Sequence, residues 1–197
     1  MKILLILAAL AANSGQAQSL LAEAKANAVN GVYTKPWKAE GDMKLASMQA
    51  LKNASNAIVV AKPVSNATRL TADGSALTTT IKFVIQDVYV HDVQDISMVP
   101  GWGVSVRFAG GDHHFRAAGI WVHYASRHAR LPRDTKRSYM LFLKMAPDGV
   151  WETVGQMQGV LEIDPSTQTV KPGDKRASSV SAAVYKHTAQ EVVNSLH

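Results

Sequence analysis

Apolar positions follow the two-residue period of β-strands through much of the region between residues 57 and 170. Across 103–108, valine and phenylalanine alternate with polar residues, which is typical of a strand with one face in water. Residues 138–145 are almost continuously apolar, which predicts a central strand buried on both faces. A shorter strand is predicted over 120–124. The pattern indicates a mainly β protein.

A hairpin is predicted at the start of this region. The β-branched run 57–61 should form a strand that Pro63 confines to a sheet edge or ends, because proline cannot donate a ladder hydrogen bond. Asp73 and Gly74 adopt positive φ at low cost, so we expect the chain to turn there and return as a second strand.

Two longer segments show irregular patterns. Across 78–90 the apolar residues change parity near Gln86–Asp87, and a β-bulge there would bend the strand as barrel corners require. Residues 151–163 are predicted to form another strand, with Gly155 and Gly159 as bulge positions. These bends favour an open antiparallel barrel or a sandwich.

Helices are predicted on both sides of the β region. Ser19 is placed to cap a helix over 20–30, and Gly31 is placed to end it. Apolar spacing predicts two further helices over 43–53 and 179–196, although the β-branched start of the latter leaves a final strand as the alternative. The expected fold class is mainly β (α+β), with helices flanking the sheet at the N- and C-terminal ends.

The first seventeen residues have the composition of an export signal. Lys2 supplies a positive end, residues 3–12 form an uncharged apolar run, and Gly15 and Ala17 place small residues where a signal peptidase cleaves. At about ten residues the run is too short to cross roughly 30 Å of hydrocarbon as a permanent helix. We therefore predict a mature chain that begins near Gln18, has no transmembrane segment and is periplasmic or extracellular.

These assignments divide the chain into a signal peptide (1–17), an N-terminal helical segment (18–56), a β domain (57–170) and a linker with a C-terminal helix (171–197). Apolar residues make up 47% and charged residues 18%, which indicates a folded chain. There is no cysteine, which excludes disulfides, thiolate metal ligands and a cysteine nucleophile. Stability must therefore come from packing.

Five short motifs suggest a known type of barrel; they are Thr78–Thr80, Asp87–Tyr89, Gly110–Gly111, Arg137–Leu143 and Gly155–Gly159. In these motifs the chain resembles small exported bacterial proteins of unassigned activity, whose β domain is similar to the netrin/tissue-inhibitor type of oligonucleotide/oligosaccharide-binding barrel. The resemblance implies a fold alone, since a fold does not determine function. The eukaryotic inhibitors act through an amino-terminal cysteine that this chain lacks.

The sequence contains none of the common catalytic motifs that we sought. It has no G-x-S-x-G elbow, no H-E-x-x-H helix and no G-x-x-x-x-G-K-[ST] phosphate loop. Serines do occur near histidines, but a catalytic triad is defined by geometry. The sequence thus favours a binding or structural module over an enzyme.

Histidines are concentrated in one short region, and the four candidates are His113, His114, His123 and His128. Imidazoles bind zinc or copper when three or four converge, and Asp112 could complete such a shell. Against this, adjacent residues point to opposite sides of an extended backbone. We expect solvated histidines in a polar loop and a strand, with a metal-binding protein or metal-dependent enzyme as the alternative.

Basic residues are concentrated between residues 105 and 137, which hold seven lysines or arginines and two acidic residues, in a chain of net charge +6. Planar guanidinium groups match phosphate, sulfate and carboxylate, and aromatic residues are interleaved with them. The predicted anion-binding residues are Arg107, Arg116, Arg127, Arg130 and Arg133. The alternative is a basic surface that only keeps the protein soluble.

The sequence therefore predicts an exported, non-catalytic module whose basic face contacts an anionic partner. Acidic polysaccharide, lipopolysaccharide and lipid headgroups are the expected partners, and no sequence-specific nucleic acid is expected. No cofactor is predicted unless the histidines converge on zinc or copper. A protein-interaction domain that uses an exposed sheet edge is a third alternative.

Overall fold

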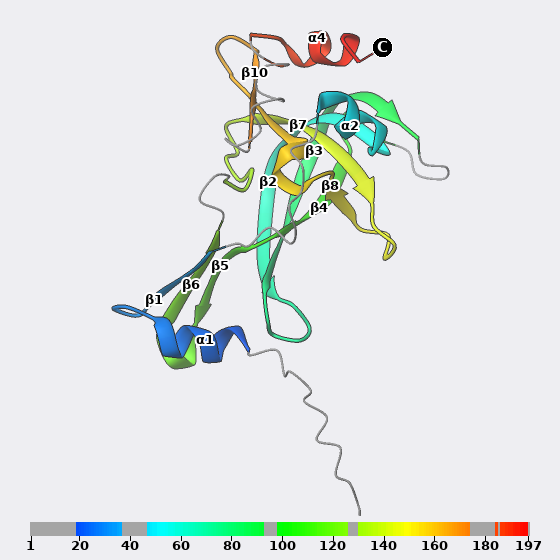
Figure 1. Ribbon diagram of the computed structural model, residues 1–197. Coiled ribbons are helices and arrows are strands. Elements are labelled where there is room, and N and C mark those ends of the chain that lie inside the picture. The colour runs from blue at the N-terminus through cyan, green and yellow to red at the C-terminus, as the bar shows by residue number, and fades with distance from the viewer. Residues whose placement is uncertain are drawn as a thin grey trace, which may run out of the picture.

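Two β-sheets make up most of the molecule in the computed structural model, which describes residues 19–36, 47–92, 98–125, 130–173, 184 and 186–196 (Figure 1). The mainly β fold predicted from the sequence is confirmed, with short helices towards both ends. The elements in chain order are α1 (Leu20–Asn27), β1 (Val32–Pro36), α2 (Met48–Asn53), β2 (Ala57–Leu70), β3 (Leu77–His91), β4 (Gly103–Ala109), β5 (Gly111–Phe115), η1 (Arg116–Ala118), β6 (Ile120–Ala125), β7 (Ser138–Met145), β8 (Trp151–Thr153), η2 (Gln156–Gly159), β9 (Val160–Ile163), β10 (Val170–Pro172) and α4 (Ala189–Asn194).

Five strands of the larger sheet follow one another in a ring. β7 pairs with β2, β2 with β3, β3 with β4 and β4 with β8, and β8 pairs again with β7. The β4–β8 pairing is parallel and covers two residue pairs, whereas the other pairings are antiparallel. The sheet is thus a partly closed barrel, and β9 and β10 extend it beyond β7.

β8 and β9 lie one after the other along the same edge of β7. β8 pairs with Leu143–Met145 and β9 pairs with Ser138–Leu141, so the six residues 154–159 lie opposite Phe142 alone. The continuous strand predicted over 151–163 is therefore wrong in its middle. The reason is local, because Gly155 adopts a left-handed conformation (φ 58°) and turns the chain out of the ladder into η2.

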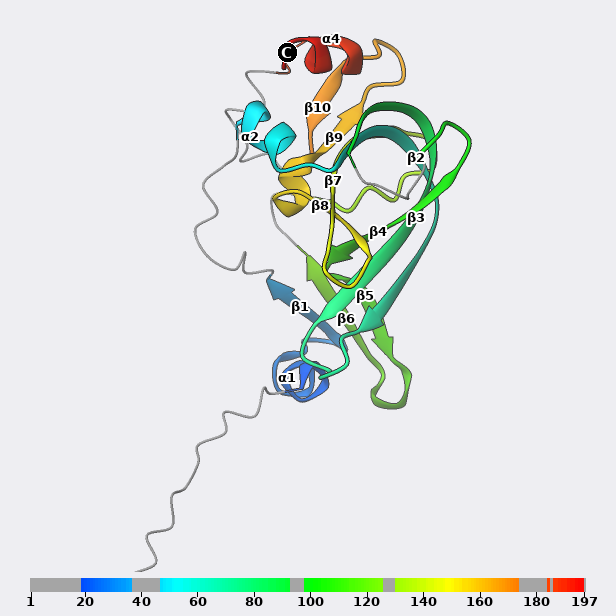
Figure 2. The same ribbon diagram turned by 90° about the vertical axis from the view of Figure 1, so that its right-hand side faces the viewer.

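β2 and β3 form the hairpin predicted at Asp73 and Gly74, and it reaches from the barrel to the small sheet and α1 (Figure 2). Register shifts leave Gln86 of β3 without a partner in β2, which confirms the predicted bulge. Pro63 lies beyond Ala61, the last β2 residue that pairs with β7, and so takes the edge position that its missing N–H requires.

Both faces are buried along β7, as predicted, and along the first five residues of β2, 57–61. Val59, Phe83 and Leu141 belong to the cluster inside the barrel. Ile58 and Phe142 face the other way and pack in a second cluster with residues of α2, β9 and α4. The barrel wall therefore has an apolar layer on each side, and the helices cover the outer one.

The small sheet, here called sheet A, has the order β1-β6-β5. β1 and β6 are parallel, whereas β5 and β6 are antiparallel. Tyr33 and Val122 pack on its inner face against Leu20 and Ala24 of α1 and Leu77 of the barrel hairpin. Neither β1 nor β5 was predicted from the sequence.

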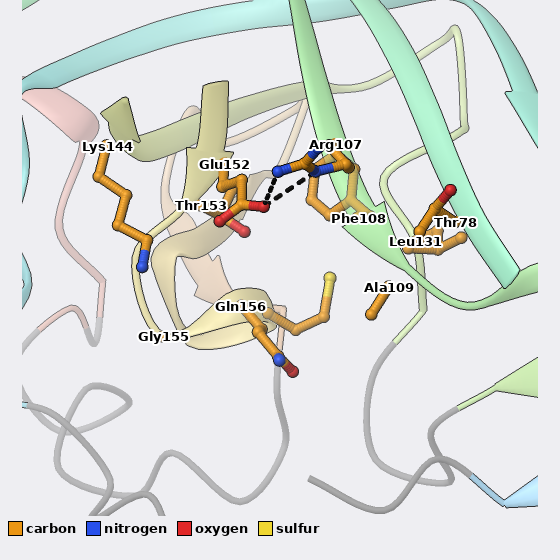
Figure 3. Close-up of a pocket in the computed structure, with 11 residues that line it drawn as sticks. Thr78, Arg107, Phe108, Ala109, Leu131, Lys144, Glu152, Thr153, Gly155 and Gln156 are labelled. Carbon is orange, nitrogen blue, oxygen red and sulfur yellow. Dashed lines mark hydrogen bonds and ion pairs between the residues drawn. The ribbon is translucent and has the colours of Figure 1, made fainter. Parts of the chain in front are cut away.

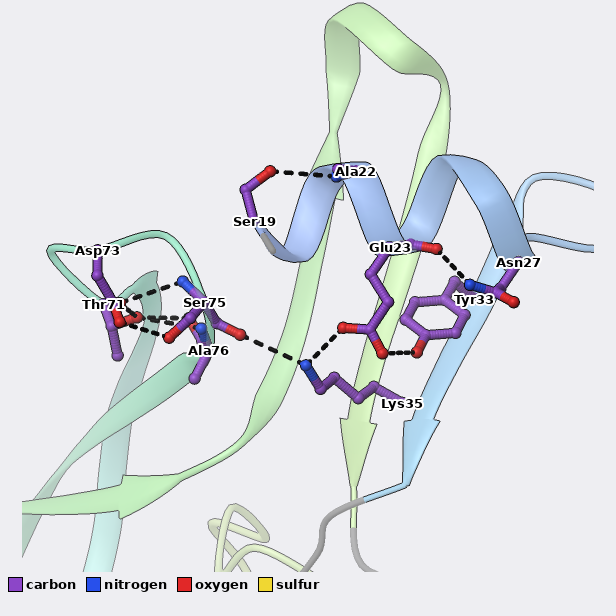
Figure 4. A network of polar contacts seen from close by, with 10 residues as sticks. All are labelled: Ser19, Ala22, Glu23, Asn27, Tyr33, Lys35, Thr71, Asp73, Ser75 and Ala76. Carbon is purple, nitrogen blue, oxygen red and sulfur yellow. Dashed lines mark hydrogen bonds and ion pairs between the residues drawn. The ribbon is translucent and has the colours of Figure 1, made fainter. Parts of the chain in front are cut away.

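A polar network fixes α1 between sheet A and the hairpin tip (Figure 4). The Lys35 ammonium bonds Glu23 Oε2 at 2.6 Å and the Ser75 carbonyl at 3.5 Å, and the Tyr33 hydroxyl donates to Glu23 Oε1. Burial, together with the Glu23 carboxylate, raises the pKa of Tyr33 to about 12. The phenol therefore remains a donor throughout the physiological pH range.

The helices begin where side chains cap them. Ser19 caps α1 as predicted, but the helix ends at Asn27 and not at Gly31, because Ala28 is already extended. At the other end Thr188 and Glu191 form a capping box at the start of α4, and Lys186 just before it has φ 59°. The helix predicted over 179–196 therefore does not run continuously through Lys186; its residues 179–183, like residues 43–46 of the helix predicted before the sheet, lie outside the described chain.

Two glycines connect β4 of the barrel to β5 of sheet A: Gly110 lies between the strands and Gly111 begins β5. Gly110 has φ 87° and Gly111 has φ 133°. A Cβ on Gly110 would lie 2.5 Å from the Tyr124 carbonyl oxygen, and one on Gly111 would lie 2.2 Å from Thr79 Oγ1. Close backbone approach and unusual dihedral angles both require glycine here.

Thr79 is fully buried beside this connection and joins both sheets. Its hydroxyl donates to the Gly110 carbonyl at 2.7 Å and lies 2.9 Å from Thr68 Oγ1 and 3.3 Å from an Arg133 guanidinium nitrogen. Since its one proton goes to Gly110, Thr68 and Arg133 must be donors to it. The hydroxyl thus uses its one donor and both acceptor sites.

Gly111→Ala is expected to lower the free energy of unfolding by about 2–4 kcal/mol, because the new methyl group meets Thr79 and the backbone is strained. Gly149→Ala is the matched control. Gly149 also has positive φ, but nothing lies within 4 Å of its Cβ position, so the cost should be about 1–2 kcal/mol. Urea denaturation measures both, and equal losses would contradict the steric argument.

Thr79→Val preserves the shape of the side chain but removes the hydroxyl, and should cost about 1–3 kcal/mol because Gly110 and Thr68 lose their partner. Thr79→Ser keeps the hydroxyl and should cost less. Thermal unfolding of the two variants tests this, and a valine variant as stable as the serine variant would show that the hydroxyl contributes nothing.

Candidate ligand-binding face

Three near-parallel rings stand on the outer face of sheet A. The imidazole of His114 in β5 stacks on the indole of Trp121 in β6, with ring centroids 4.5 Å apart and planes inclined by 7°. The imidazole of His123 lies on the same indole at 6.4 Å, again at 7°. Trp121 is 46% exposed. We call His114, Trp121 and His123 the ring row.

Strand register explains how the ring row forms. His114 lies directly opposite Trp121, and Asp112 lies directly opposite His123. Because side chains alternate along a strand, these four residues share one face, while Val122 points to the packed inner face. Trp121 is thus a large apolar side chain on the exposed face of the sheet, although large apolar side chains are usually buried.

The histidine candidates are separated by this alternation. His113 contacts Phe115 edge-on at 4.7 Å, whereas His114 stacks on Trp121 on the opposite face. His128 lies outside the described residues. Among the described residues, no group of three or more histidine, aspartate or glutamate side chains is placed to hold a metal ion.

Asp112 lies at the end of the ring row and is bound from two sides. Its carboxylate lies 2.9 Å from His123 Nδ1 and 2.6 Å from an Arg133 guanidinium nitrogen. Partial burial raises the pKa of Asp112, but the hydrogen bonds from His123 and Arg133 outweigh it, and the net shift is downward. Asp112 is therefore ionised at neutral pH. Arg133 also bonds Thr79, which connects this face to the barrel.

The arginine candidates that the structure describes occupy different environments. Arg107 in β4 is held by Asp148 at 2.6 Å and Glu152 at 2.7 Å rather than by Asp112, although it lies opposite Thr80, next to the Thr79 that Arg133 bonds. Arg116 and Arg130 are exposed, and neither forms an ion pair with a described residue. Arg127 lies outside the described residues. Among the described arginines, only Arg133 touches the group that carries the ring row.

Sequence reasoning missed that two exposed histidines would flank a tryptophan. The stretch Gly111–Phe115 contains no β-branched residue and was interpreted as a polar loop, yet it forms β5. The earlier run Val32–Thr34 contains two β-branched residues and a tyrosine after Gly31, which was an available strand signal. The exposure of Trp121 could not be predicted, because its neighbours in space come from two other strands.

Comparison with known proteins does not assign the chain to a group: no protein-family model, no curated protein and no solved structure matches it.

Proposed function

We propose that the protein is a non-catalytic module that binds an anionic polysaccharide on the outer face of sheet A. The observation that carries this proposal is the ring row, in which an indole exposed to 46% is stacked with two imidazoles. Exposed aromatic rings on a sheet are typical of surfaces that bind planar or ring-shaped ligands.

The ring row offers both apolar and polar contacts to a sugar chain. His114 covers one face of the Trp121 indole, so the exposed edge of the ring row meets the C–H groups of a sugar ring, and imidazole nitrogens exchange hydrogen bonds with its hydroxyl groups. Asp112 and Thr34 lie on the same face, since Thr34 is opposite His123 in the β1–β6 register. Consecutive sugar units could thus lie along the strands.

The charge of the face supports an anionic ligand. Asp112 and Arg133 compensate each other at the end of the ring row. Arg116 follows β5 directly, is exposed and forms no ion pair with a described residue, so it adds a positive charge at the end of sheet A. Binding of a polyanion should therefore weaken as the salt concentration rises.

Trp121→Ala is expected to weaken binding of an oligogalacturonate at pH 6 by about tenfold or more, since one stacked ring contributes about 1–3 kcal/mol. The matched control is Trp102→Ala. Trp102 is 58% exposed but lies just before β4 in the barrel, so its removal should leave binding unchanged. Isothermal titration calorimetry measures both dissociation constants.

Two results would overturn the proposal. Equal losses in the Trp121 and Trp102 variants would show that the ring row is not the site. Tighter binding of single-stranded DNA than of oligogalacturonate, with the same dependence on Trp121, would assign the face to nucleic acid instead. A neutral maltooligosaccharide should bind more weakly than the oligogalacturonate, and equal affinity would remove the anionic part of the proposal.

A further inference from the structure

A pocket opens in the barrel wall where β4 and β8 separate. The two strands pair only at Val106–Trp151 and Arg107–Glu152. Beyond these pairs β8 ends at Thr153 and the chain turns away through Gly155, whereas β4 continues to Ala109. The opening left between them has a volume of about 260 Å³.

The inner wall of the pocket is apolar and rigidly placed. Phe108 and Met157 line it, and both belong to the buried cluster inside the barrel. Leu131, which packs against the same cluster, lines it as well. The pocket therefore gives access from the surface to the apolar interior, as ligand sites in barrel mouths do.

The outer rim carries a row of charged side chains (Figure 3). Cross-strand register places Lys144 opposite Glu152, and Glu152 opposite Arg107. Arg107 donates to Glu152 Oε1 through two nitrogens, at 2.9 Å and 2.7 Å, and to Asp148 at 2.6 Å. The Arg107 guanidinium is thus shared between two carboxylates, and both of its bonds to Glu152 end on the same oxygen.

Lys144 is the charged group of the rim that remains available. It forms no hydrogen bond or ion pair with any residue in the described part of the chain. Arg107 is shared between Asp148 and Glu152, so the four rim charges, with Lys144, sum to zero, and an anion beside Lys144 displaces no existing ion pair of a described residue. An anionic group at the rim would meet Lys144 as its counter-charge.

The chain segment that forms the lower wall is conformationally strained. Gly155 and Gln156 both adopt left-handed backbone angles, φ 58° and 57°. This conformation is costly for glutamine, and such strain is found preferentially at functional sites. Gln156 Oε1 is buried and accepts no hydrogen bond from a described residue, so this wall contains an unsatisfied hydrogen-bond acceptor.

We propose that the pocket binds a small amphipathic carboxylate, with the carboxylate beside Lys144 and the apolar tail against Phe108, Leu131 and Met157. The volume limits the ligand to a modest size, because cavities for drug-sized molecules measure roughly 300–1,000 Å³. This site is separate from the ring row and does not depend on the polysaccharide proposal.

Octanoate is the probe, and the expected dissociation constant, measured by calorimetry, lies between about 10 μM and 1 mM for a ligand of this size. Lys144→Gln should raise the dissociation constant of octanoate about threefold to tenfold, because it removes one exposed ion pair. Lys82→Gln is the matched control. Lys82 is an exposed lysine in β3 that does not line the pocket, and its loss should have no effect.

A second variant tests the apolar part. Ala109→Trp places a large ring at the exposed pocket edge of β4, where an aromatic residue suits a strand, and should abolish octanoate binding while the protein remains folded by circular dichroism. Unchanged octanoate affinity in either the Lys144 or the Ala109 variant would overturn the proposal. Oligogalacturonate binding should be unchanged in both, so failure of one site is distinguishable from failure of the other.

Discussion

The fold depends on one buried hydroxyl, that of Thr79, which connects the barrel to sheet A. It supports the Gly110 carbonyl at the point where the chain leaves the barrel, and it receives hydrogen bonds from Thr68 and from Arg133. Arg133 in turn holds Asp112, and Asp112 binds His123. A series of hydrogen bonds therefore connects the buried hydroxyl to the exposed imidazole, although Nε of Arg133 is itself buried and has no hydrogen-bond partner among the described residues.

The two candidate sites arise from opposite properties of β-sheets. Sheet A buries one face on α1 and the barrel hairpin, so the alternation of side chains leaves Trp121 and its neighbours on the other face. The pocket instead arises from failed pairing, since β8 is too short to accompany β4 to its end. Regular pairing thus presents a flat surface, and interrupted pairing gives access to the interior, within one small molecule.

Local patterns in the sequence predicted most strands of the barrel, but not the interruption between β8 and β9 and not the sites. The turn at Asp73, the bulge at Gln86 and the doubly buried β7 all follow from the residues of the segment itself. The pairing of β1 with β6 does not, because no local pattern specifies a parallel partner so distant in sequence. The engagement of Arg107 by Asp148 and Glu152 was equally inaccessible, since a count of charges does not show which charges meet.

The parallel pairing of β1 with β6 also has a consequence for the order of folding. Val32 meets Trp121 only after about 90 further residues have been made, and such distant contacts form slowly because a long loop must close. Because synthesis starts at the amino terminus, α1 and β1 are made before β6, and they cannot pack in sheet A until the barrel hairpin and β6 have followed. During that interval the apolar side chains of Leu20 and Tyr33 have no partner in β6, and such transiently exposed apolar surface promotes aggregation.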